Sequence, residues 1–207
     1  MHAQTLIAGK TDMSRMPVGT LWLVTVMLTG WCMFMPGLLL ADSDHGSITV
    51  ADVETVKGDK AWLLNASMEI NLSSGAFEAL ENGVPLVFEM QVQVLETHTW
   101  FWDSVLSEYK QVRQVQYHAL SSSYLVRDLE TGAQRSYRDL EDALLAAGYL
   151  RNLPLLQYHS MEDKNSYSVR LRCSLDIESL PTPVRLLAYV SSAWDMDNEW
   201  YQWPLVR

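Results

Sequence analysis

The chain has 207 residues, 48% of them hydrophobic, and it carries 25 acidic against 15 basic side chains, for a net charge of −10. A surface with this excess of negative charge repels nucleic-acid phosphates and anionic lipid headgroups, so the composition argues against nucleic acid as a partner. Solubility is the simplest explanation of the acidity.

The first part of the sequence has the features of an export signal. Lys10 and Arg15 precede a stretch without charge over residues 16–41, which a Pro36-Gly37 pair interrupts. A basic start, an apolar segment, a helix-breaking pair and a final small residue are typical of a cleavable secretory signal. We therefore expect export to the periplasm, with cleavage after Ala41.

An uncleaved membrane anchor is the alternative to cleavage. A helix that spans a bilayer needs roughly 20 apolar residues, and residues 16–41 are long enough only if the Pro36-Gly37 pair lies within the span. Leu39, at the third position before the cleavage point, is larger than the Ala that such sites prefer. Residues 1–41 are thus predicted to be a signal peptide or an inner-membrane anchor, and residues 42–207 a single β-rich domain.

Alternating apolar and polar residues predict amphipathic strands after residue 41. The alternation is strongest over residues 63–72, 86–94 and 167–177, where one face of each segment is apolar. Such half-buried strands are typical of antiparallel sheets, because parallel sheets are usually covered on both faces. Weaker patterns predict strands at 48–56, 110–118, 124–128, 133–137, 184–190 and 200–206. Residues 130–132, with Gly132 last, are expected to form a hairpin turn.

Two short helices are predicted between the strands. Apolar residues at 140, 143, 144 and 147 share one face of a helix from Tyr137 to Ala147, with Ser136 and Asp139 at capping-box spacing. A second helix is predicted from Ser74 to Glu81, with apolar residues 77 and 80 facing inward.

These elements together indicate a mainly β fold. The number and length of the strands favour an antiparallel β-sandwich, of immunoglobulin-like size, with two short helices. An α+β arrangement, in which the longer helix packs on a single sheet, is the alternative.

Familiar catalytic and metal-binding motifs are absent from the sequence. The histidines after residue 41, at 45, 98, 118 and 159, have no second ligand at metal-binding spacing, and residues 195–199 lack the Gly and the final Glu of an EF-hand. Cys173 lies on the apolar face of the segment 167–177, so we expect a buried, inert thiol. We predict no catalytic residue, no cofactor and no metal.

An enzyme remains the alternative function. Residues 121–123 are serines that lie near His118, Arg127 and Asp128 in sequence, and they would form a hydrolytic site only if the fold brought these groups together. Three serines between two predicted strands are more typical of a turn. A carrier of an apolar ligand between the two sheets is the third possibility.

The arginines form a further set of candidates. Those at 127, 135, 170 and 172 could hold a carboxylate or phosphate in an otherwise acidic protein. Cross-strand pairing with acids such as Asp128, Glu130 and Asp176 is the simpler expectation.

An aromatic cluster is the strongest candidate for a contact surface. Trp100, Phe101 and Trp102 follow a predicted strand, and tryptophan is over-represented at protein interfaces. Closure of one end of the sandwich core is the alternative role for this cluster. The leading hypothesis is a non-enzymatic periplasmic protein, a binding or accessory module whose partner is a membrane or envelope protein.

Several segments of the sequence together form a distinctive pattern. They are residues 82–89, 100–102, 117–120, 124–132, 134–136, 180–185 and 200–203. In these segments the chain resembles a family of exported proteobacterial proteins defined by a domain of unknown function, number 4390. The resemblance implies an envelope location in a Gram-negative bacterium and a link to a membrane sensor kinase of the nitrogen-regulation type. It implies no activity and no site residue.

Overall fold

The computed structural model describes residues 45–98, 102–158 and 166–205. All of them belong to the unit Ser43–Arg207. The predicted signal peptide or anchor, residues 1–41, lies outside the described residues, as do Trp100 and Phe101 of the predicted contact patch. Within the described part of the chain, no helix is both long enough and apolar enough to cross a membrane.

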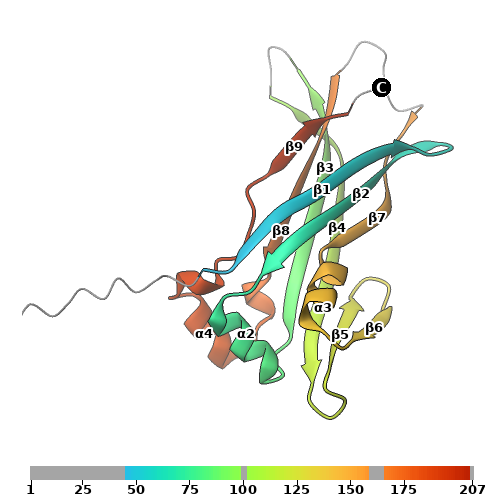
Figure 1. The fold of residues 1–207 in the computed structure, drawn as a ribbon. Coiled ribbons are helices and arrows are strands. Elements are labelled where there is room, and N and C mark those ends of the chain that lie inside the picture. Colours follow the sequence, from blue (N-terminus) through green and yellow to red (C-terminus); the bar gives the residue numbers. More distant parts are fainter. Residues whose placement is uncertain (1–44, 99–101, 159–165, 206–207) are drawn as a thin grey trace, which may run out of the picture. The chain divides into compact units, whose positions relative to one another are not determined.

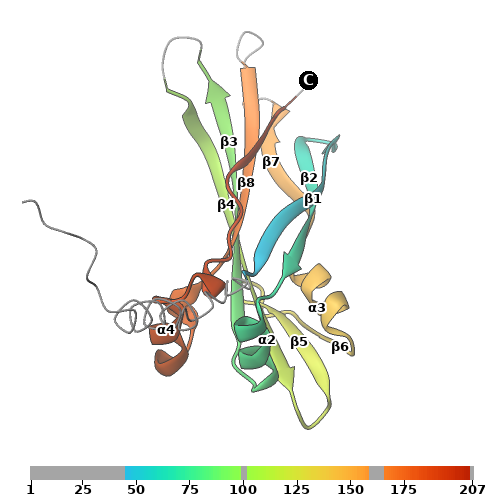
Figure 2. The same ribbon diagram turned by 60° about the vertical axis from the view of Figure 1, so that its left-hand side comes forward.

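The described strands form two antiparallel sheets (Figure 1, Figure 2). The smaller sheet has the order β1-β2-β7 and contains β1 (Ser47–Lys57), β2 (Ala61–Asn71) and β7 (Tyr149–Gln157). The larger sheet has the order β6-β5-β4-β3-β8-β9 and contains β3 (Leu86–Thr97), β4 (Ser104–His118), β5 (Ser123–Asp128), β6 (Gln134–Tyr137), β8 (Ser166–Leu175) and β9 (Tyr201–Pro204). The predicted mainly β fold with antiparallel pairing is confirmed.

Apolar side chains from both sheets form a common core. Leu64 and Met68 of β2, Phe88 and Met90 of β3 and Leu171 of β8 are each at most 1% exposed. Burying one such side chain contributes about 1.5–3 kcal/mol, so these residues hold the two sheets together. They occupy the alternate positions that the sequence pattern assigned to the buried face.

Cys173 on β8 belongs to the same core. It pairs with Met90 in the β3–β8 ladder and is fully buried. Burial raises the pKa of its thiol to about 12, so the sulfur stays protonated and unreactive at neutral pH. The prediction that this thiol is buried is confirmed.

Helix α2 (Ser74–Glu81) has the bounds predicted from the sequence. The Ser73 hydroxyl accepts a hydrogen bond from the Ala76 N–H at 3.2 Å, which caps the first turn. Ala76 and Leu80, four residues apart, form the buried face of the helix. Phe77 is 44% exposed, so the prediction that it faces inward is wrong.

Helix α3 (Leu140–Ala147) is shorter than predicted at its start. Tyr137 and Ser136 still pair with β5 as part of β6, so they cannot contribute to a helical cap. Asp139 occupies the N-cap position without a side-chain hydrogen bond, and the predicted capping box is therefore wrong. The predicted apolar face is correct, because Ala143, Leu144 and Ala147 are buried.

Helix α4 (Thr182–Ala188) replaces a strand that we predicted at residues 184–190. Pro181 takes the N-cap position and Pro183 lies in the first turn, where the fixed φ of proline suits a helix and no donor is needed. The chain continues through two short 3-10 turns, Ile177–Ser179 before the helix and Ser192–Trp194 after it. The described residues thus contain three α-helices rather than two.

Strand β7 was not predicted at all. Its pairing with β2 shifts register twice, and Asn152 has a positive φ of 50°. The Asn152 N–H is held by the Asn65 side-chain oxygen at 2.9 Å. These irregularities remove the alternation that marks a strand in sequence.

Gly148 fixes the junction between α3 and β7 against the smaller sheet. Its carbonyl accepts a hydrogen bond from the Met68 N–H at 3.0 Å. A Cβ at this position would lie only 2.7 Å from the Met68 carbonyl oxygen, so only glycine permits this approach. The chain therefore crosses from β6 of the larger sheet, through α3, to β7 of the smaller one.

Candidate functional site

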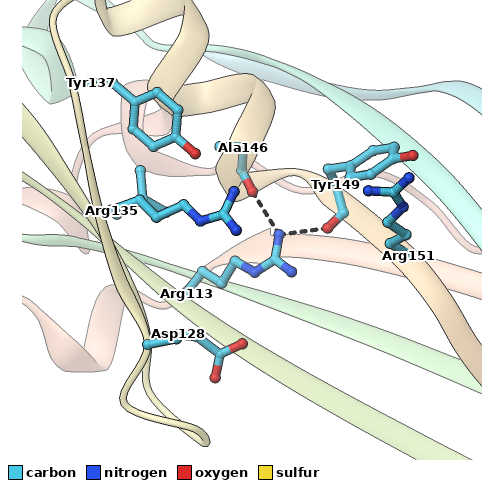
Figure 3. A pocket seen from close by; sticks show the side chains of 9 residues that line it. Arg113, Asp128, Arg135, Tyr137, Ala146, Tyr149 and Arg151 are labelled. Carbon is cyan, nitrogen blue, oxygen red and sulfur yellow. Dashed lines mark hydrogen bonds between the residues drawn. The ribbon is translucent and has the colours of Figure 1, made fainter.

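A surface cavity of about 380 Å³ lies where β4, the β5–β6 hairpin, α3 and β7 meet (Figure 3). We call it the arginine pocket. Its lining consists of Arg113, Val126, Asp128, Ala133, Arg135, Tyr137, Ala146, Tyr149 and Arg151. Three arginines and one carboxylate line it, although the whole chain has a net charge of −10.

Arg113 on β4 forms the half-buried floor of the arginine pocket. Its Nη1 donates to the Ala146 carbonyl at 2.6 Å and to the Tyr149 carbonyl at 2.5 Å (Figure 3). The last carbonyls of a helix have no partner within the helix, and a cation there also suits the helix dipole. Burial lowers the pKa of Arg113 from its usual value, but an arginine remains charged at neutral pH. Arg113 therefore joins the larger sheet to the end of α3.

Asp128 is the acid that lines the arginine pocket, and its oxygens are already occupied. Oδ1 accepts the N–H groups of Glu130 and Thr131 at 3.1 and 2.8 Å, and Oδ2 accepts from Gln111 at 2.9 Å. Burial alone would raise the pKa of Asp128, but these hydrogen bonds lower it below its usual value. Its main role is to hold the β5–β6 turn, in which Gly132 has a φ of 73°. The predicted hairpin turn at residues 130–132 is confirmed.

Arg135 and Arg151 reach the arginine pocket from β6 and β7, two elements of different sheets. Both residues are exposed, and neither guanidinium has a hydrogen bond or an ion pair with another described residue. Figure 3 shows the guanidinium of Arg135 directed toward that of Arg113, with Arg151 beside Tyr149. Such planar groups bind carboxylate and phosphate through two parallel hydrogen bonds. The site can therefore bind an anion.

The predicted pairing of the other arginines with nearby acids is largely wrong. Arg127 donates to the Gln134 side-chain oxygen at 3.1 and 2.8 Å, and Arg170 donates to that of Gln93 at 2.7 Å. Arg172 does pair with an acid, but the acid is Asp197 rather than Asp176. The acids that we named belong to turns, where backbone N–H groups hold Asp128 and Asp176.

The sequence pattern points to Arg135 but to neither Arg113 nor Arg151. Arg113 lies among the polar residues of β4, where a basic side chain is not unusual. Arg151 lies on β7, for which the sequence pattern predicts no strand. The local signal in the sequence is the position of Arg127 and Arg135 on either side of the β5–β6 turn. The arginine pocket depends on contacts between segments that are distant in the chain.

The structure brings His118 and Ser121 of the proposed hydrolytic site together, but Asp128 lies apart from them. His118 Nδ1 lies 3.1 Å from the Ser121 hydroxyl, in an exposed turn where Ser122 has a φ of 46°. In the β4–β5 ladder His118 pairs with Ser123, whereas Asp128 pairs with Arg113 at the other end. That separation is about 16 Å along the strand. His118 and Asp128 therefore cannot act on one substrate atom.

The predicted contact patch is described only at Trp102, which is 94% exposed. Val105 and Leu106, at the start of β4, are exposed as well. Trp102 does not close the end of the core, so the alternative role of the patch fails for this residue. Its role as a contact residue stays a prediction.

The comparisons with known proteins place the chain in a family. Residues 45–204 match the family model of DUF4390, a domain of unknown function. No curated protein and no solved structure gives a match. Since the matched segment covers most of the chain, including every element around the arginine pocket, the protein belongs to the DUF4390 family.

Proposed function

We propose that this chain is an exported, non-enzymatic binding module of the bacterial envelope. In this proposal the arginine pocket holds a carboxylate of a membrane-protein partner, and a sensor kinase is the leading candidate for that partner. The observation that carries the proposal is the pair Arg135 and Arg151, which line one cavity without any described partner. Export and the envelope location are supported by the sequence of residues 1–41.

The charge distribution supports a ligand at the arginine pocket. The chain has 25 acidic side chains for 15 basic ones, so an arginine would find an acid easily if pairing were its only role. The one acid of the arginine pocket, Asp128, is engaged by the turn and by Gln111. Arginines gathered in one cavity repel each other, and a bound anion would relieve this repulsion.

The size and lining of the arginine pocket support a protein partner over a large metabolite. A volume of about 380 Å³ is near the lower end for ligand sites, and an acidic side chain or a terminal carboxylate fits inside it. Tyr149, at the rim, is 42% exposed, and tyrosine together with arginine is enriched at the centres of protein interfaces.

Site-specific photocrosslinking in cells tests the proposal. A photoreactive residue at position 149 is expected to give one discrete adduct with a membrane protein, and Arg135→Gln with Arg151→Gln is expected to abolish it. The same label at Tyr201, an exposed residue of β9 at the other edge of the larger sheet, is the positional control. Arg127→Gln is the matched variant, because Arg127 is bonded to Gln134 and does not line the arginine pocket.

Two results would contradict the proposal. One is an adduct at position 149 whose yield is the same in the double variant and in Arg127→Gln. The other comes from the purified protein: acetate and inorganic phosphate, titrated separately, should shift the amide NMR signals around β6 and β7. Shifts of equal size in the Arg135→Gln, Arg151→Gln variant would show that the arginines do not bind the anion.

A further inference from the structure

Helix α4 and the residue pair after it expose a cluster of apolar side chains, which we call the α4 patch. Leu186, Leu187, Tyr189 and Val190 are between 58% and 83% exposed, whereas Ala188 faces the protein and is buried. Single exposed apolar residues are common on soluble proteins, but a contiguous cluster marks a surface that another phase or molecule covers.

The chain enters the described domain beside the α4 patch. His45 Nδ1 lies 3.3 Å from the carbonyl oxygen of Ser192, two residues beyond Val190. The next residue, Gly46, packs so closely that a Cβ would lie 2.0 Å from the sulfur of Met196. These contacts fix the entry point of the chain next to the α4 patch.

The sequence before this entry point is short and then apolar. Only residues 42–44 separate His45 from Ala41, the last residue of the uncharged stretch 16–41. Four residue steps span at most about 14 Å, even when the chain is fully extended. If the stretch 16–41 remains in a bilayer, the bilayer surface lies within this distance of His45.

We propose that, in the membrane-anchored form of this protein, the α4 patch lies in the interfacial layer of the lipid bilayer. The occupant is lipid, because a bilayer that holds residues 16–41 is the apolar phase that must be near His45. The nearby acids do not oppose this contact strongly. Glu178 accepts a hydrogen bond from the Tyr189 hydroxyl and pairs with Arg185, and Asp197 pairs with Arg172. Asp195 is left at the exposed edge of the patch.

This orientation would also bring the arginine pocket to the membrane side. In both views α4 and the β5–β6 hairpin lie at the same end of the two sheets, and the last residues of β3 and the first residues of β4 lie at the opposite end (Figure 1, Figure 2). The inference does not depend on the arginine pocket, but it would place that pocket where a membrane protein can reach it.

Fluorescence depth measurements on the full chain test the inference. Leu187→Cys is labelled with an environment-sensitive dye, in a chain with Cys32→Ser, and reconstituted in phosphatidylcholine vesicles that contain a spin-labelled lipid. Cys173 is fully buried and is not expected to react in the folded protein. We expect blue-shifted emission and strong quenching at position 187. The matched label at Val105, an exposed residue of β4 at the opposite end, is expected to show neither.

A second variant separates lipid contact from other causes. Leu186→Glu with Val190→Glu changes only exposed side chains, so the unfolding temperature should stay the same while quenching at position 187 is lost. Quenching at 187 no stronger than at 105 would overturn the inference. So would a label at 187 that is shielded only at high protein concentration, because that result would assign the α4 patch to a second copy of the chain.

Discussion

The two arginines of β8 and the two exposed arginines of the arginine pocket have opposite surroundings. Arg170 donates to Gln93 and lies 4.5 Å from the centre of the Trp200 ring, and Arg172 pairs with Asp197. Arg135 and Arg151 have no such partner among the described residues. Both pairs lie on strands of the same acidic protein, so composition does not decide which arginine is paired. The neighbours that the fold supplies decide it.

The largest effect is expected from Arg113→Ala, since Arg113 lines the arginine pocket but is bonded like the β8 arginines. The substitution leaves the carbonyls of Ala146 and Tyr149 without their charged donor in a half-buried site. We expect the free energy of unfolding to fall by about 2–3 kcal/mol. Urea unfolding, with the m-value compared between variants, measures this change.

Arg127→Ala is the control for Arg113→Ala. Arg127 is exposed and bonded only to Gln134, so its removal should change the free energy of unfolding by no more than about 0.5 kcal/mol. Arg113→Lys keeps the charge but has a single donor group, and it should recover part of the loss. If Arg113→Ala were as harmless as Arg127→Ala, Arg113 would not join the sheet to α3.

Arg170→Ala tests how much a bonded arginine of β8 contributes to stability. It removes the hydrogen bond to Gln93, which is buried, and the cation–π contact with Trp200. We expect a loss of about 1–2 kcal/mol in the free energy of unfolding. Thermal unfolding followed by circular dichroism gives the readout. An unchanged unfolding temperature would mean that Arg170 contributes no more to stability than Arg135 and Arg151, which have no described partner.

Asp128, in the wall of the arginine pocket, is expected to make the free energy of unfolding depend on pH. Its pKa is lower in the folded protein, so its ionised form stabilises the fold at pH values above the ordinary pKa of an Asp. This contribution is lost as the pH falls below about 4, through the folded-state pKa. Asp128→Asn should therefore be less stable than the unchanged protein at pH 7, and the difference should shrink toward pH 3. Urea unfolding at both pH values measures it, and a difference that grows on acidification would contradict this account.

The smallest effect on stability is expected from Arg135→Gln and Arg151→Gln. Neither residue has a partner to lose among the residues that the structure describes, so each change should stay within about 0.5 kcal/mol. The same variants are expected to lose anion binding, which separates binding from folding. A loss of stability comparable to that of Arg170→Ala would show that these arginines already have a structural partner.

Alternating residues predicted most of the strands because their cause is local. In a strand, successive side chains point to opposite faces, so a sheet with one buried face leaves its period in the sequence. This is why the core positions of β2, β3 and β8, with Cys173 among them, followed from the pattern. The first turn of α2 likewise has a local cause in the Ser73 cap.

Local patterns failed where a segment has no regular period. The apolar run after Pro183 suits either a strand or a helix by composition, and the two prolines at its start favour the helix that forms. β7 has register shifts and a positive φ at Asn152, which are stabilised by its partner β2 and not by its own sequence. A strand of this kind is defined by its neighbour.

The sequence by itself determined the class of the fold, the buried face of each regular strand and membership of the DUF4390 family, because these depend on residues that are close together in the chain. Only the tertiary structure decided where the arginines gather. Arg113, Arg135 and Arg151 come from three strands of two sheets, joined through α3 and the close approach of Gly148 to Met68. Pairing between distant segments leaves no period in the sequence, so the candidate site emerged from the folded chain alone.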